Sequence, residues 1–278
     1  MKVPSASFPR QDSGQAGQIP PDLKAEIARR IARRRESCIG YLLCSDEWII
    51  QEIENEKKLQ ETSTPESEYH EKLLKEFERQ VETITGKAYA EAAGMKPDEY
   101  RKMFEPLKER IREIAQREKE MKEGHIPFVI VIKNDVISGE KAMPLIELDG
   151  KKGTSYLEAK TIKEFKTIEG VKIPNGQAYL AIDIETGKTT LGKTPDEAIK
   201  KIKSENRSPL TLEEGVALIT HHPEILKDHY VWAPGSRHGD DLVALLWLFG
   251  GRPKLLWHWA YRSYARWGSA SCGSRVGP

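Results

Sequence analysis

Residues 126–133 read IPFVIVIK. This short, continuous apolar run follows Gly124 and is typical of a buried β-strand. The residues before Gly124 are predicted to be essentially all-helical, whereas those after it mix predicted strands with predicted helices. The sequence therefore favours an α+β fold, with an N-terminal helical region followed by a mixed or antiparallel sheet domain with flanking helices, over a regularly alternating α/β fold.

Two helix starts precede this strand. Thr64-Pro65-Glu66 places a capping hydroxyl before a proline at the first helical position, a combination that favours a helix start. Lys96-Pro97 predicts a second helix, which Pro106 should kink or split. Apolar residues follow the first start at helical spacing: Leu73, Leu74, Phe77, Val81 and Ile84.

The chain is predicted to have four parts. Residues 1–20 are polar and are expected to form a disordered tail. Residues 21–62 are expected to form a helical extension that carries a basic arm. Residues 63–124 form the helical region, and residues 125–278 form the α+β domain with a tryptophan-rich hairpin near its end.

Several elements are expected within the α+β domain. Met143–Leu148 is a candidate second strand. Gln177–Glu185 alternates in polarity and turns through Thr186-Gly187, which predicts a hairpin with Lys188–Leu191. Two capping boxes, which begin at Thr194 and Thr211, each predict a helix of about ten residues.

The last predicted strands flank Gly250-Gly251-Arg252-Pro253, a hairpin signal. Leu242–Phe249 and Lys254–Ala260 are apolar on both faces, so both strands are expected to be buried. Alternation places Trp257 and Trp259 on one face and His258 on the other.

Composition bounds the class of protein. The chain has 278 residues, of which 38% are hydrophobic and 31% charged, and its net charge is +1. This balance gives no global attraction to nucleic acid or membrane, although residues 1–36 and 227–278 each carry a net +4. The three cysteines lack paired spacing, so no disulfide framework is expected and a cytoplasmic location is predicted. No apolar run reaches the length of a membrane span.

The candidate site lies in the last fifth of the chain, where five of the seven histidines and five of the six tryptophans occur. The most site-like segment is the predicted loop Gly235–Asp241, because glycine lets the backbone approach a ligand and arginine suits planar anions. An ordinary turn, with Arg237 paired to Asp240 or Asp241, is an equal alternative. The candidate ligand-binding residues are Ser236, Arg237, His238, Asp240 and Trp257.

A catalytic alternative uses His238 or His258 with Cys272 or Asp240, as a hydrolase or transferase. His221-His222 is expected to lie at a helix C-terminus, where histidine suits the free carbonyls. No standard metal motif occurs, so neither a metal nor a cofactor is predicted. The carboxylates of Asp183 and Glu185 are expected to be solvated beside a hairpin turn.

A second alternative is association with nucleic acid through a basic helix, which predicts steeply salt-dependent binding. No aromatic residues interleave with its arginines, as they would in a stacking platform. A solvated face or a partner-binding arm is therefore favoured over this alternative. The arginines are Arg29, Arg30, Arg33, Arg34 and Arg35.

Several segments together resemble an uncharacterised bacterial family, domain of unknown function 5701, over about residues 73–273. They include IPFVIV at 126–131, SPLTLEEGVALITH at 208–221, GSR at 235–237, GRPK at 251–254 and WGSASC at 267–272. Trp257-His258-Trp259 departs from the Trp-Cys-Trp pattern of the family. The resemblance implies no activity, cofactor or partner.

The combined expectation is a soluble, non-catalytic binding or interaction module. Its polar and aromatic C-terminal pocket would accept a small anionic or polar ligand, or a peptide of a partner protein. The sequence leaves open whether the protein is an enzyme and what its oligomeric state is.

Overall fold

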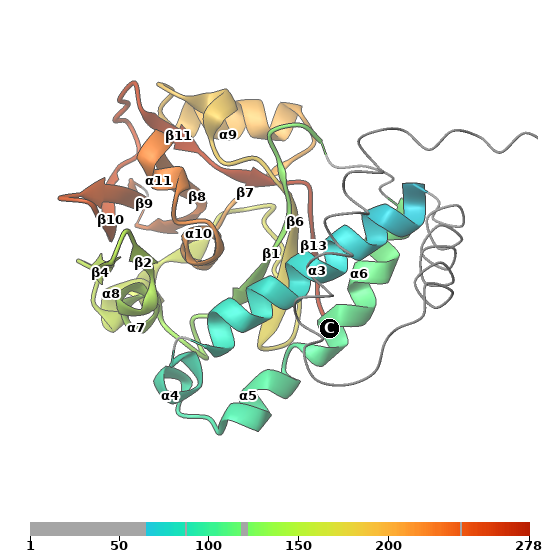
Figure 1. Cartoon of the computed structure of the whole chain (residues 1–278). Helices are drawn as coiled ribbons and strands as arrows, with labels where there is room; N and C mark the ends of the chain where they lie inside the picture. Colours follow the sequence, from blue (N-terminus) through green and yellow to red (C-terminus); the bar gives the residue numbers. More distant parts are fainter. Residues whose placement is uncertain (1–64, 87, 118–121, 240) are drawn as a thin grey trace, which may run out of the picture. The chain divides into compact units, whose positions relative to one another are not determined.

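The fold is taken from a computed structural model, which describes residues 65–86, 88–117, 122–239 and 241–278 (Figure 1). The predicted tail, the helical extension and the Arg29–Arg35 cluster lie outside these residues. So do Asp240 and the capping residue Thr64.

The N-terminal part of the described chain is helical, as predicted. Leu73, Phe77 and Ile84 face inwards and are buried, so the helical spacing marked the packed face correctly. The predicted second helix is split before Pro106, which takes the second position of a new helix. The helices are α3 (Pro65–Thr85), α4 (Tyr89–Ala93), α5 (Pro97–Lys102) and α6 (Glu105–Arg117).

A three-stranded antiparallel sheet packs against these helices. It consists of β1 (Ile126–Ile132), β6 (Ala178–Ile184) and β13 (Ser274–Val276), in the order β1-β6-β13. The predicted hairpin between Gln177–Glu185 and Lys188–Leu191 is wrong, because Lys188–Thr190 forms a short 3-10 helix, η2. Every residue of β6 is buried, and its backbone is paired on both sides by strands distant in sequence.

On the edge of β1 that does not face β6, side chains form hydrogen bonds with the backbone of the strand. The Gln80 amide donates to the Phe128 carbonyl at 2.9 Å and accepts from the Ile130 N–H at 2.8 Å. His221 Nε2 lies 3.0 Å from the Ile130 carbonyl. These contacts satisfy backbone groups that would otherwise be buried without a partner, so His221 serves a carbonyl of β1 rather than those of its own helix.

The second sheet is mixed and has six strands, in the order β11-β8-β9-β10-β4 with β5 also paired to β8. The predicted hairpin of β9 and β10 is confirmed, but the expectation that both strands are fully buried is wrong. Trp257 and Trp259 are each 39% exposed. The strands are β4 (Thr154–Ser155), β5 (Lys166–Thr167), β8 (Tyr230–His238), β9 (Leu242–Phe249), β10 (Arg252–Trp259) and β11 (Trp267–Ser269).

Helix α10 (Leu212–His221) lies between the two sheets and contacts β1, β8 and β9 (Figure 1). Both predicted capping boxes are confirmed, at Thr194 for α9 (Pro195–Ser204) and at Thr211 for α10. Gly215 brings α10 close to the second sheet, since a Cβ there would lie 2.6 Å from Leu246 Cδ1. One continuous core therefore joins the helices to both sheets.

Short elements complete the fold. The candidate strand at Met143–Leu148 is correct only for its last two residues, because residues 143–145 form a 3-10 helix, η1. None of the helices in the described part of the chain combines the length and the apolar composition that a bilayer span requires. The remaining elements are α7 (Gly139–Ala142), β2 (Glu147–Leu148), β3 (Lys151–Lys152), α8 (Ala159–Glu164), β7 (Ser208–Pro209), α11 (Ile225–Asp228) and β12 (Ser271–Cys272).

Candidate functional site

The predicted loop Gly235–Asp241 is mostly strand, because β8 continues to His238. Its side chains alternate and reach different neighbours. The Ser236 hydroxyl is buried and accepts a hydrogen bond from the Leu212 N–H at 3.1 Å. Arg237 pairs with Asp196 at 2.6 Å, and His238 Nε2 pairs with Glu164 at 2.8 Å. The three residues therefore do not converge on one ligand.

The environment of Cys272 argues against its use as a nucleophile. The residue is completely buried, and burial, aided by the negative charge of Glu214, raises the pKa of the thiol to about 12. A reactive cysteine needs a lowered pKa. Within the described residues no hydrogen bond joins Cys272 to His238 or His258.

His258 lies among aromatic rings on the face of β10 that also carries Leu256. It contacts Trp232, Trp267 and Tyr264 at centroid distances of 6.2, 5.5 and 6.2 Å. Burial lowers the pKa of the imidazole, and Nδ1 accepts the Trp259 N–H at 2.9 Å. His258 Nδ1 therefore provides a hydrogen-bond acceptor for the Trp259 amide, which no strand of the described chain pairs.

The opposite face of β10 carries the exposed rings of Trp257 and Trp259, and Tyr261 continues this row in the turn just after the strand. We call these three residues the aromatic face. The two tryptophan rings meet edge to face at 6.0 Å, and Trp259 stacks on Tyr261 at 5.9 Å. Tyr261 is 59% exposed and has the Arg262 guanidinium over its ring. Contiguous exposed aromatics of this kind mark interaction surfaces.

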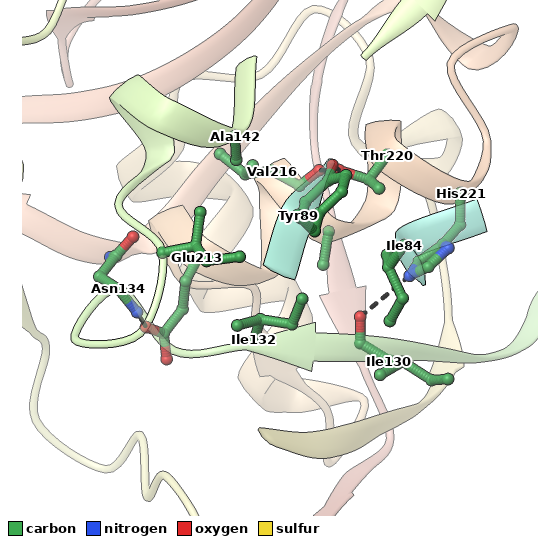
Figure 2. A pocket seen from close by; sticks show the side chains of 12 residues that line it. Ile84, Tyr89, Ile130, Ile132, Asn134, Ala142, Glu213, Val216, Thr220 and His221 are labelled. Atoms are coloured by element: carbon green, nitrogen blue, oxygen red, sulfur yellow. Dashed lines mark hydrogen bonds between the residues drawn. The ribbon is translucent and has the colours of Figure 1, made fainter. Parts of the chain in front are cut away.

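A small cavity lies between α10, β1 and α4 (Figure 2). Its volume of about 20 Å³ suits a water molecule rather than a metabolite. Ile130, Ile132 and Val216 line it together with His221. Burial lowers the pKa of His221 to about 3, so the imidazole is neutral and its Nε2–H donates to Ile130.

Glu213 also lines this cavity, and the pKa of its carboxyl is shifted upwards. Burial raises its pKa to about 7; the hydrogen bond from the Asn134 N–H opposes this shift and the neighbouring Glu214 adds to it. The Tyr179 hydroxyl lies 3.1 Å from Glu213 and 2.9 Å from Glu214. Glu214 forms an ion pair with Arg275, whose Nε and Nη2 atoms lie 2.5 and 2.8 Å from its two oxygens.

Asp183 forms a second buried charge cluster, and the expectation of solvated carboxylates at Asp183 and Glu185 is wrong. Both residues are buried. The Asp183 carboxylate is 2.5 Å from His125 Nδ1, 2.6 Å from Lys122 Nζ and 2.6 Å from Arg207 Nη1. Burial opposes ionisation, but these three hydrogen bonds lower the pKa of Asp183 to about 2. Glu185 instead accepts the backbone N–H groups of Gly187 and Thr189.

No sequence pattern predicted the Asp183 cluster. Its members come from the segment before β1, the end of β6 and the segment between α9 and β7, so no local spacing links them. The capping box did identify Glu214, whose carboxylate accepts the Thr211 N–H at 2.8 Å, but not its ion pair with Arg275.

Comparison with known families identifies the chain. A family model matches residues 83–278, and the chain belongs to this family of unknown function, DUF5701. The resemblance inferred over residues 73–273 is thereby confirmed, with both limits shifted towards the C-terminus. Searches of curated proteins and of solved structures found no match.

Proposed function

We propose that this member of a family of unknown function is a binding module for an acidic, extended peptide segment of a partner protein. The segment would lie along the open edge of β10, against the aromatic face. The observation that carries the proposal is the coincidence, within the described ranges of the chain, of a strand edge without a partner strand and exposed tryptophans. Catalysis through Cys272 is disfavoured by its burial, and the predicted cytoplasmic location stays a prediction.

Among the residues that the structure describes, no strand pairs with the second half of the outer edge of β10. Its neighbour β4 pairs only with Lys254 and Leu255, and the Tyr156 N–H bonds to the Leu255 carbonyl just beyond. Further along, the Trp259 N–H is satisfied by His258 rather than by a strand. An exposed edge of this kind can accept a peptide as an additional strand through main-chain hydrogen bonds.

The aromatic face would supply affinity to such a strand. Large rings bury much apolar area with few rotatable bonds, and tryptophan and tyrosine are enriched among residues that dominate binding energy. Trp257 and Trp259 are two residues apart and project from the same side of β10. Their spacing equals the two-residue repeat at which side chains of an added strand would face them.

Charge specifies the partner. From Leu242 to the end of the sequence the chain contains no aspartate or glutamate. The same stretch contains Arg252, Lys254, Arg262, Arg266 and Arg275. Arg275 pairs with Glu214 and Arg266 donates to the Lys227 and Asp228 carbonyls, so the positive charge offered to a partner comes mainly from the other three residues. A positive rim of this kind attracts an acidic segment and repels a second copy of itself.

The test uses a fluorescently labelled short peptide of alternating glutamate and valine and measures its anisotropy with the full chain. Binding is expected, and it should weaken about tenfold or more in Trp257→Ala and Trp259→Ala. Phe249→Ala is the matched control, because Phe249 is also exposed but lies at the other end of the hairpin.

Two altered peptides separate the contributions. Replacing glutamate by lysine should abolish binding through charge, and methylating alternate backbone nitrogens should abolish it by removing the main-chain donors. Equal binding of the methylated peptide would overturn edge pairing. Tighter binding of oligothymidylate than of the acidic peptide would assign the surface to nucleic acid, and dimerisation lost in Trp257→Ala would assign it to a second copy.

A further inference from the structure

We propose that His125 is a phosphoryl-accepting histidine, held by Asp183 so that its Nε2 attacks an anionic phosphoryl donor of the phosphoramidate class. The proposal goes beyond the peptide surface and does not rest on it. It is carried by the geometry of the Asp183 cluster.

The imidazole is oriented for this role. His125 Nδ1 lies 2.5 Å from Asp183 Oδ1, so the Nδ1–H donates to the carboxylate and the lone pair is left on Nε2. The side chain is 20% exposed, and no residue of the described chain makes a hydrogen bond to Nε2. A carboxylate that accepts the Nδ1–H in this way fixes the tautomer and the orientation of the ring.

Asp183 is itself held rigidly. Its φ of +56° lies in the left-handed region, which is rare for a residue other than glycine and is often found at functional sites. Arg207 bonds both the carboxylate and the Asp183 carbonyl. Gly273 lies against the carboxylate so closely that a Cβ there would be 2.9 Å from Oδ2. Elements distant in sequence therefore keep the partner of His125 in place.

The charge around the imidazole favours an anionic electrophile. Lys122 and Arg207 both contact the single carboxylate of Asp183, which leaves an excess of positive charge. Arg207 is mostly buried, but the Lys122 side chain is 62% exposed and can turn towards an incoming group. A flexible ammonium beside a nucleophile suits the oxygens of a phosphoryl group.

Four other histidines lack this combination. His221 and His229 are buried and bond backbone carbonyls through Nε2. His222 lies between Glu76 and Glu224. His238 also meets a carboxylate, but through Nε2, and the Glu164 side chain is 47% exposed. His238 is therefore the natural control.

The reaction transfers a phosphoryl group from the phosphoramidate to His125. The Nε2 lone pair attacks phosphorus, an N–P bond forms, and the P–N bond of the phosphoramidate breaks. The leaving nitrogen, which carries its full set of protons in the zwitterionic donor, departs with that electron pair, as neutral ammonia when the donor is phosphoramidate itself, and the Nδ1 proton stays between His125 and Asp183. The positive charge that develops on the imidazole is stabilised by Asp183 through the Nδ1–H.

The experiment treats the full chain with potassium phosphoramidate and follows the product by phosphorus NMR and peptide mass spectrometry. We expect a single phosphoryl group on Nε2 of His125, formed about tenfold or more faster than on His238, as the orienting effect of a buried carboxylate implies. His125→Gln should lose the signal, and His238→Gln should keep it. In urea the preference for His125 should vanish.

Two positioning variants test the cluster. Asp183→Asn should slow phosphorylation of His125 and shift the product towards Nδ1, a change that loss of folding alone would not give. Lys122→Gln removes an exposed side chain and should slow the reaction in a fully folded protein. Wild-type rates in both variants, no incorporation in the wild type, or equal incorporation in His125→Gln would each overturn the proposal.

Discussion

The three-stranded sheet and the β9–β10 hairpin place their polar and aromatic residues in opposite ways. Around β6 and β13, buried carboxylates are paired with cations: Asp183 with Lys122 and Arg207, and Glu214 with Arg275. On β10, Trp257 and Trp259 are exposed instead. Buried charge requires defined partners, whereas exposed aromatic area favours binding. The first region is therefore expected to govern stability and the second to govern association.

The largest expected effect on stability comes from breaking the buried ion pair between Glu214 and Arg275. Arg275→Ala would leave the Glu214 carboxylate without its cation in a fully buried position, so the free energy of unfolding should fall by about 3–5 kcal/mol. Urea denaturation measures the change. Arg252→Ala, at an exposed arginine of β10, should change stability by less than about 0.5 kcal/mol. Similar losses of unfolding free energy in the two variants would show that the buried ion pair contributes no more to stability than an exposed arginine of β10.

The next effect concerns pH. Because the pKa of Glu213 rises from 4.5 to about 7 on folding, the folded state binds this proton more tightly. Its contribution is fully present below pH 4.5 and is lost as the pH rises through 7, which amounts to about 3 kcal/mol. Glu213→Gln should flatten this part of the stability profile in denaturation measured across the range. An unchanged slope would show that another group controls it.

A smaller effect is expected where the two sheets meet α10. Gly215→Ala places a Cβ 2.6 Å from Leu246 Cδ1 and 3.0 Å from Ala233 Cβ. Overpacking of this kind should destabilise the protein by about 1–3 kcal/mol, measured as a lower urea midpoint. If Gly215→Ala were stabilising, the helix and the sheet would have more room than the structure shows.

The smallest stability effect is expected on the aromatic face. Trp257→Ala removes a ring that is 39% exposed, so unfolding should change by less than about 1 kcal/mol while binding of the acidic peptide falls. Trp232→Ala is the internal comparison, because Trp232 is fully buried and its loss should cost about 3–5 kcal/mol. Equal destabilisation would mean that Trp257 serves the core.

The successes and failures of the sequence predictions have a common physical origin. Apolar periodicity located α3 and the strand at residues 126–132, and both capping boxes were correct, because these signals depend on residues close in sequence. The hairpin expected after Gln177 failed because β6 pairs with β1 and β13 instead. The prediction that β10 is fully buried failed because hydrophobicity cannot show whether another element covers each face of a strand.

The sequence by itself determined the α+β class, the family, the capped helices and the hairpin that carries the tryptophans. Only the tertiary structure decided which charges are buried together and which rings remain outside. His125 and Asp183 are 58 residues apart, and Glu214 and Arg275 are 61 apart. Pairings at such separations depend on how β6, α10 and β13 pack, since local spacing constrains neighbours only within a turn or a strand pair.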